Sequence, residues 1–264
     1  MRTVLRAVLL CWAMSLLLPA GAQGVEFHVA YEDKDSYDHT GNGAVMPDEP
    51  GVVVELVDLV QQRLPELRLR YSRKPWARCL AELEVGAVDA VFSSSFKPER
   101  LAIGVYPMHK GQVDRRFRID SKTYSLYTKR PSTLAWDGSG FGKRSPALIA
   151  LRGYAIVDDL RKQGLTVNEV NSPEDAFRML LAGRADGFVH LTEFADYKLK
   201  KNRDFAAIAK SGPPVAVKDY YLQISHRFHN EHPALAQRIW NTLREVRQSD
   251  SERLLGKYLR RSSE

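Results

Sequence analysis

Three histidines stand three residues apart, a spacing that can bring imidazoles together around a metal ion. They are His226, His229 and His232. A predicted strand ends just before them and Pro233 starts the next predicted helix, so the three side chains need not face one point. We therefore expect no metal site here.

A loop rich in acidic residues follows the first predicted strand. Asp33, Asp35 and Asp38 alternate in this loop, but Tyr37 and His39 stand where a calcium loop needs oxygen ligands. The sequence also contains neither a glycine-rich phosphate loop nor a nucleophile elbow. We therefore expect no cofactor.

The chain has two cysteines, and neither is expected to be a nucleophile. Cys79 has Leu80 and Leu83 beside it and no paired base nearby, which predicts a buried thiol in a helix. Cys11 lies in an N-terminal apolar run that we expect to be removed. A single remaining cysteine cannot form an intramolecular disulfide.

The N-terminus has the three zones of a secretory signal. Arg2 and Arg6 precede an apolar run at residues 7–18, and Ala20-Gly21-Ala22 supplies small residues for cleavage. The run is too short to span a bilayer as a stable helix. We expect a signal peptide at residues 1–22, cleavage near Ala22, and a mature protein in the periplasm.

The formal net charge is +7, and loss of the signal peptide would lower it by two. Basic residues cluster at 115–118 and 198–203, but export argues against nucleic acid as a partner. We interpret both runs as solvated faces.

One pattern occurs twice in the chain, at residues 80–92 and 177–189. In each copy an apolar-periodic helix ends at a glycine, Gly86 or Gly183. An aspartate three residues later then opens an apolar run typical of a strand buried in a parallel sheet. The repeat predicts two α/β lobes.

The rest of each lobe follows from periodicity. Helices are expected at 52–64, 156–163, from Pro173 onward, at 233–247 and, as a separate short helix, through Leu254, Leu255 and Tyr258; strands are expected at 25–31, 67–71, 147–151, 166–170 and 220–225.

The lobes themselves are expected to be discontinuous. Residues 23–110 and 214–264 would form lobe 1, and residues 111–213 would form lobe 2, with two hinge crossings near 106–112 and 210–217. Ligands of open α/β sheets bind beyond the carboxyl ends of the strands, so facing lobes would enclose a ligand cleft.

In their order and spacing these residues resemble the periplasmic solute-binding proteins of the polar amino-acid type, often called extracellular solute-binding proteins family 3. The resemblance spans nearly the whole mature chain and implies the two-lobed type 2 periplasmic-binding fold. Its best segment runs from Gly51 to Tyr106 and contains Pro75-Trp76, Leu83, Gly86, Asp89, Ser93-Ser94-Ser95 and Glu99-Arg100.

The resemblance implies a ligand site in lobe 1. Arg100 matches the arginine that binds the ligand α-carboxylate, and a guanidinium fork suits a carboxylate. Ser93 and Ser95 match positions that hold the ligand. Four further candidates are implied or suggested nearby: Trp76 as an aromatic wall, Tyr37 as the opposite wall with Tyr31 as its competitor, and Arg78 as a second positive charge.

Lobe 2 departs from the family pattern at two positions. Tyr154 follows Gly153 where the family has Thr or Ser, at a helix N-terminus whose amides help bind the carboxylate. Leu191 stands where the family has the aspartate that holds the ligand amino group, which puts an ordinary α-amino acid in doubt. Replacement carboxylates could come from Glu193, Glu32, Asp33 or Asp35, and His190 could be a ligand-facing donor.

We therefore expect a monomeric binding protein that closes around a small polar, carboxylate-bearing ligand for transport or sensing, together with a membrane permease or a membrane sensor. Two alternatives remain on the same fold. One is a dehydratase-like periplasmic enzyme, for which Glu193 or His190 would have to act as acid or base. The other is a ligand sensor that depends on a separate membrane partner.

Overall fold

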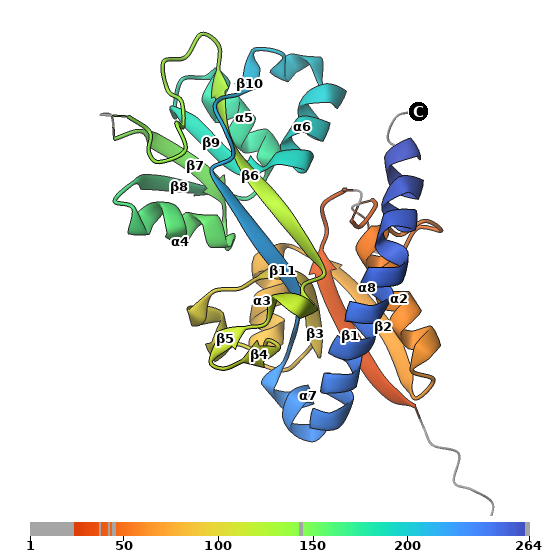
Figure 1. Cartoon of the computed structure of the whole chain (residues 1–264). Helices are drawn as coiled ribbons and strands as arrows, with labels where there is room; N and C mark the ends of the chain where they lie inside the picture. The colour runs from red at the N-terminus through yellow and green to blue at the C-terminus, as the bar shows by residue number, and fades with distance from the viewer. Residues whose placement is uncertain (1–23, 37, 42, 44–45, 143–144, 262–264) are drawn as a thin grey trace, which may run out of the picture.

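The computed structural model describes residues 24–36, 38–41, 43, 46–142 and 145–261. The predicted signal peptide and Tyr37 therefore lie outside the described residues. Nine strands form one mixed sheet in the order β2-β1-β3-β11-β6-β9-β7-β8, with β10 paired to β6. Figure 1 shows two α/β halves joined by the long strands β6 and β11.

The first half is built on three parallel strands, β1 (Val25–Glu32), β2 (Leu67–Lys74) and β3 (Ala90–Ser95). Helix α2 (Val52–Arg63) packs against α8 (Pro233–Arg261) over one face of these strands, with α7 (His226–Glu231) at one end of α8. Helix α3 (Trp76–Glu84) covers the other face. Alternate strand residues such as Phe27 and Val29 are fully buried against α2 and α8.

The second half repeats this arrangement. Strands β7 (Ala147–Leu151), β8 (Thr166–Val170) and β9 (Gly187–Leu191) are parallel, and β6 (Asp120–Lys129) pairs antiparallel with β9. Around them lie α4 (Ala155–Lys162), α5 (Pro173–Leu181), α6 (Thr192–Lys201) and β10 (Ile208–Lys210).

The two copies of the sequence repeat have the same local structure. Asp89 precedes β3, and its carboxylate accepts the backbone N–H of His28 on the neighbouring strand at 2.8 Å. Asp186 precedes β9, and its carboxylate accepts the backbone N–H of Ala147 at 2.9 Å. Each aspartate also donates its own N–H to the carbonyl of that same partner. Both aspartates thus tie two parallel strands together where the inner strand begins.

The first crossing lies further along the chain than the sequence predicts. The range 106–112 falls in the hairpin of β4 (Met108–His109) and β5 (Gln112–Val113), and a 3₁₀ turn at Arg115–Phe117 packs against α8. The strand that joins the halves starts at Asp120. Strand β11 (Ala216–Ile224) returns beside it, with Tyr220 opposite Asp120. A two-stranded ribbon therefore connects the halves.

The C-terminal segment also differs from its prediction. Instead of two helices it forms the single helix α8, because Val246, Leu254 and Tyr258 continue one buried face across the polar stretch between them. The Tyr258 hydroxyl accepts the backbone N–H of Gly51 at 2.9 Å, which fixes the last turns of α8 to the start of α2. Over the described residues, no helix combines the length and apolarity that crossing a bilayer requires.

Candidate functional site

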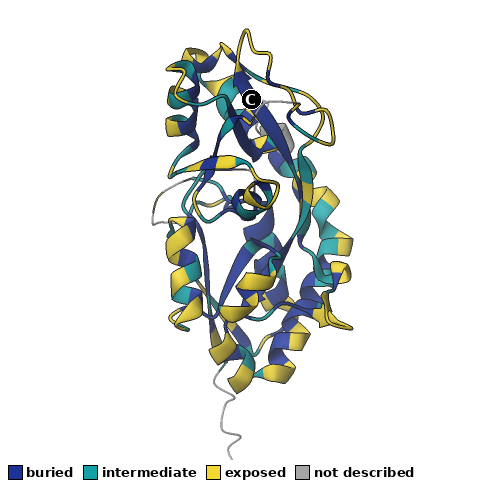
Figure 2. Ribbon diagram, turned by 90° about the vertical axis from the view of Figure 1, so that its left-hand side faces the viewer, coloured by how far each residue is buried: buried dark blue, intermediate teal, exposed yellow. Residues whose placement is uncertain are grey.

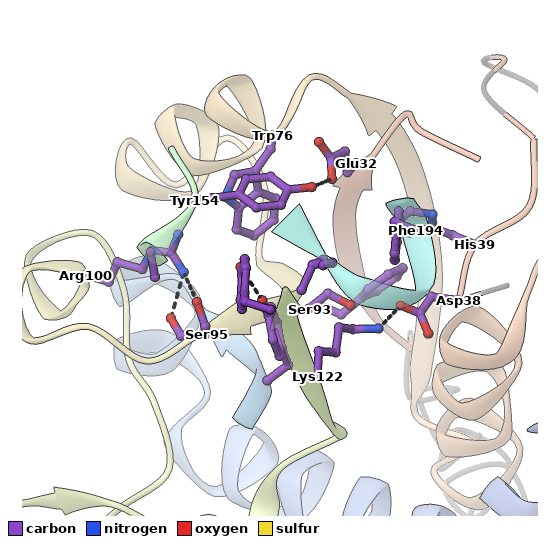
Figure 3. Close-up of a pocket in the computed structure, with 15 residues that line it drawn as sticks. Glu32, Asp38, His39, Trp76, Ser93, Ser95, Arg100, Lys122, Tyr154 and Phe194 are labelled. Carbon is purple, nitrogen blue, oxygen red and sulfur yellow. Dashed lines mark hydrogen bonds and ion pairs between the residues drawn. The ribbon is translucent and has the colours of Figure 1, made fainter. Parts of the chain in front are cut away.

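A cavity lies between the halves at the carboxyl ends of the strands (Figure 3). The first half contributes residues at the end of β1, the start of α3, strand β3 and the 3₁₀ turn Pro98–Ala102. The second half contributes residues at the start of α4 and around the junction of β9 and α6. The lining comprises Glu32, Asp38, His39, Trp76, Phe92, Ser93, Ser95, Arg100, Lys122, Tyr124, Tyr154, Ala155, Leu191, Phe194 and Tyr220.

Arg100 is buried in this cavity, with 5% of its surface exposed. One guanidinium nitrogen donates to the Ser95 carbonyl at 2.7 Å and lies 3.2 Å from the Ser95 hydroxyl. The other donates across the cleft to the Gly153 carbonyl at 2.8 Å. The guanidinium carbon lies 5.5 Å from the centre of the Trp76 ring. Among the described residues, no carboxylate forms an ion pair with Arg100, so its positive charge is held by neutral groups.

Strand β3 brings its serines to the cavity through an irregularity. The pairing with β11 shifts register between Tyr221 and Gln223, which leaves one extra residue on β3. Ser93, in this bulge, has a φ of 54°, a left-handed backbone conformation that is uncommon for residues other than glycine. Both Ser93 and Ser95 line the cavity, as does Trp76 at the start of α3.

Tyr154 fills much of the cleft between the halves. Its hydroxyl donates to the Glu32 carboxylate at 2.6 Å, and Lys34 pairs with the same carboxylate at 2.6 Å. Burial and the negative charge of Glu32 raise the pKa of the Tyr154 phenol well above its ordinary value. Between these side chains the cavity has a volume of about 30 Å³, room for about two water molecules. A larger ligand can therefore enter only if the halves separate or Tyr154 moves.

A buried ion pair at the opposite end of the cavity was not predicted. Lys122 on β6 pairs with Asp38, and both side chains are only 2% exposed. The Lys122 ammonium also lies 3.0 Å from Asp120 and within 6 Å of the ring centres of Phe194 and Tyr220. At the start of β6 the buried residues Lys122 and Tyr124 alternate with exposed or half-buried ones. In the sequence this appears as large side chains alternating with Ser and Thr, the period of two that is typical of a strand.

The remaining candidate residues lie outside the lining. Tyr31 is buried behind it, stacked on Phe92 with 4.8 Å between ring centres. Arg78 is exposed on α3 and pairs with Glu82 at 2.7 Å. Glu193 is exposed on α6, and the partial burial of its carboxyl group raises the pKa of that group.

The two acidic loop residues suggested as replacement carboxylates do not line the cavity either. Asp33 is half-buried, and the Asp35 carboxylate accepts the backbone N–H of Gly41 at 2.6 Å. Of the four proposed replacements for the family aspartate, the structure thus brings only Glu32 to the cavity.

His190 lies directly behind the cavity wall. It is 1% exposed, and its ring stacks on Phe188 at 4.9 Å and lies 5.8 Å from Tyr154, centre to centre. Neither ring nitrogen has a hydrogen-bond partner among the described atoms. Burial, with a smaller contribution from Lys34, lowers the pKa of His190 to about 3. The imidazole is therefore neutral at physiological pH.

The three evenly spaced histidines diverge. His226 is hydrogen-bonded to the Leu101 carbonyl at 2.9 Å, His229 lies against Trp240, and His232 lies against Phe228. Within the described part of the chain, no group of three or more metal-ligating side chains is placed to hold an ion.

Comparisons with known proteins identify the fold. No family model and no curated protein sequence matches the chain. Among solved structures, a histidine kinase sensor domain with similarity to periplasmic binding proteins covers 90% of this chain and 97% of its own, with a TM-score of 0.71 at 17% identity. A mutant of ArgBP from T. maritima covers 89% and 95%, with a TM-score of 0.68 at 16% identity.

The substrate-binding protein of an amino acid ABC transporter is also similar. It covers 89% of this chain and all of its own, with a TM-score of 0.67 at 13% identity. Together with the mixed sheet and the cleft between the halves, these similarities establish the α/β fold of periplasmic binding proteins. At such low identity they define the fold and leave the ligand to be argued from the site.

Proposed function

We propose that this chain is an extracytoplasmic solute-binding protein that captures a small carboxylate-bearing molecule by closing its two lobes. One observation carries the proposal: Arg100 is a buried guanidinium in the cleft whose hydrogen bonds go to neutral acceptors. A buried charge without a counter-ion is costly, and a ligand carboxylate would supply that counter-ion through bidentate hydrogen bonds. The ligand would displace the Gly153 carbonyl from the guanidinium.

The other charged groups in the lining already have opposite charges beside them. Glu32 accepts from Lys34 and Tyr154, and Asp38 pairs with Lys122. Leu191 is apolar where the resembling family has a carboxylate. A ligand ammonium would therefore have to compete with an existing counter-ion, whereas a ligand carboxylate at Arg100 would displace only a neutral carbonyl. These pairings favour an organic acid, or an amino-acid derivative, over an ordinary α-amino acid.

In this proposal the ligand-bound protein, with its lobes closed, is recognised by a membrane protein. A substrate-binding protein of an amino acid ABC transporter and a histidine kinase sensor domain share the fold. Delivery to a permease and signalling through a membrane sensor are both compatible with lobe closure. The periplasmic location rests on the signal-like N-terminus.

Catalysis by the same fold is the less favoured alternative. Glu193 and His190, the two acid or base candidates, do not line the cavity. The low pKa of His190 also removes it from proton transfer near neutral pH. If purified protein converted a bound acid to a product, the assignment would move to an enzyme.

The test is a thermal-shift screen of small organic acids, amino acids and polyamines, followed by calorimetry on the best ligand. We expect Arg100→Met to raise the Kd of an acid about a hundredfold, the loss expected for one or two charge-assisted hydrogen bonds. Arg78→Met is the matched control, because Arg78 is exposed and paired with Glu82. Equal affinity in wild type and Arg100→Met would remove Arg100 from the site.

A further inference from the structure

A second cavity lies in the first half, on the outer side of the Lys122–Asp38 pair. It has a volume of about 440 Å³ and lies between the start of α2, the middle of α8 and the residues that lead into β6. Small-molecule sites have volumes of about 300 to 1,000 Å³. It therefore has the volume of a ligand site, unlike the nearly filled cleft.

The walls of this second cavity combine an apolar floor with two guanidinium groups. Val52, Val53 and Leu56 of α2 form the floor together with Ile119, and Leu255 of α8 exposes 39% of its surface at the edge. The guanidinium groups belong to Arg118 and Arg247.

Arg247 is the unusual member of this set. Its Nε is buried and has no hydrogen-bond partner among the described atoms, and one terminal nitrogen donates to the Arg116 carbonyl at 3.3 Å. No carboxylate of the described residues forms an ion pair with it. Burial lowers the pKa of Arg247, and the nearby charges of Arg118 and Arg244 lower it further, while Asp120 and Asp219 partly oppose them. An anion beside Arg247 would give its buried, unpartnered Nε a counter-charge.

None of the described carboxylates in the same walls forms an ion pair with Arg247. Asp38 and Asp120 are directed to Lys122, with 3.0 Å between Asp120 and the ammonium, and Glu252 is exposed on α8. Arg118 lies 3.8 Å from Asp219, a carboxylate that Arg115 also contacts at 2.5 Å. Arg118 thus shares Asp219 with Arg115 and donates to the Arg115 carbonyl at 2.9 Å, so a ligand anion would add to Arg247 and compete with Asp219 for Arg118.

We propose that this cavity is a second ligand site, which binds a small amphipathic anion. Its carboxylate or sulfonate would contact Arg247 and Arg118, and its apolar body would lie on the floor against Leu255. The site is distinct from the cleft, but the two share a wall: Asp38 lines both cavities, and Asp120 of the second contacts Lys122 of the first.

The test uses 8-anilinonaphthalene-1-sulfonate, an aromatic sulfonate whose fluorescence rises in apolar surroundings. The mature chain should bind one equivalent saturably, and hexanoate should displace the dye while hexan-1-ol at the same concentration should not. Arg247→Gln should raise the Kd of the dye at least about tenfold, the loss expected for one charge-assisted hydrogen bond.

Two further variants make the result decisive. Leu255→Asp should weaken binding by a similar factor, because it places a negative charge at the cavity edge while leaving the guanidinium groups in place. Arg253→Gln is the matched control, an exposed arginine on the same helix that pairs with Asp250 at 2.7 Å. Unchanged dye affinity in both Arg247→Gln and Leu255→Asp, with native circular dichroism, would overturn the proposal. If Arg247→Gln does not fold, Leu255→Asp and Arg118→Gln decide.

Discussion

The charged residues of the cleft could be predicted from the sequence only where a local pattern places them. Ser95 ends a strand whose position the repeat predicts and Arg100 follows it, and their role in a ligand site was implied by the family resemblance. The Lys122–Asp38 pair joins a loop residue to a strand 84 residues later in the chain. Such a contact depends on how the two halves and their loops meet, which periodicity does not encode.

Tyr154 illustrates the same limit at a single position. The departure from Thr or Ser could be seen in the sequence, and the start of α4 was expected within one residue. What could not be predicted was that the phenol would reach Glu32 in the first half. Because tyrosine is longer than threonine or serine, its hydroxyl reaches Glu32 across the cleft and its ring reduces the space for a ligand.

His190 should make the folded state sensitive to acid. Its pKa is about 3 in the folded protein and about 6.5 when unfolded. Between these values the unfolded chain binds a proton that the folded protein does not, so stability falls as the pH is lowered, by about 1.4 kcal/mol per pH unit. His190→Phe, which suits the surrounding rings of Phe188 and Phe194, should remove this contribution.

The measurement is urea unfolding of wild type and His190→Phe at several values between about pH 4 and pH 6. The difference in unfolding free energy should grow in favour of the variant as the pH falls. His109→Gln, at an exposed position in β4, is the control for loss of an imidazole. A pH dependence that is identical in wild type and His190→Phe would contradict the assignment of a neutral buried imidazole.

At the element scale, segments with strong periodicity inside one lobe were predicted well, and the strand β6 that connects the lobes was not. Strands β7 and β8 have the expected bounds, and α2 starts at the expected residue, because each is a strongly periodic segment between turn residues. Strand β6 was missed because its burial alternates only where it pairs with β11, whereas its residues 124–128, which pair with β9 and β10, are all buried, so no single period runs along it. The bulge at Ser93 depends on pairing with β11, a strand of distant sequence.

Helix α4 carries the contacts that hold the mouth of the cleft together. Asp158 pairs with Lys97, Asp159 pairs with Lys218, and Lys162 pairs with Glu99 at 3.2 Å. Partly exposed ion pairs contribute about 0.2 to 1 kcal/mol each. Replacing both aspartates with asparagine should therefore raise the ligand dissociation rate constant about twofold to thirtyfold.

This effect should be measured by stopped flow with the acid identified in the screen. At about 0.5 M salt the difference between wild type and the double variant should shrink, because screening weakens exposed pairs. Asp175→Asn, which removes an exposed pair with Arg178 on α5, is the matched control. Equal dissociation rates at low salt would show that the pairs do not resist opening.

On the scale of the whole molecule, the two halves share more than a hinge. One buried cluster contains Trp76, Cys79 and Leu83 of α3 together with the core of the second half, including Leu148 and Phe188. The second half also connects to the first through β6 and β11, which pair with each other, and β11 continues into a pairing with β3 of the first half. Figure 2 shows buried residues in the cores of both halves, whereas most residues of the connecting ribbon are half-buried or exposed, so the shared cluster carries the packing between the halves. Packing across the cleft therefore couples the stability of the halves.

We accordingly expect the mature chain to unfold as one cooperative unit, although chains of this size often unfold in stages. Trp240 lies in the core of the first half and Trp136 in that of the second, so in a Trp76→Phe background the fluorescence of Trp240→Phe and Trp136→Phe reports on each half separately. Cys79 is buried in the shared cluster, and burial raises the pKa of its thiol to about 12, so labelling of this thiol shows when the interface between the halves opens.

The expected result is a single transition. After each variant's midpoint has been adjusted for its change in stability, measured by circular dichroism, the urea curves of both variants should coincide with the curve from thiol labelling. If Cys79 became reactive, or one tryptophan signal changed, at a lower urea concentration than the rest, the halves would unfold separately and the shared cluster would not couple them.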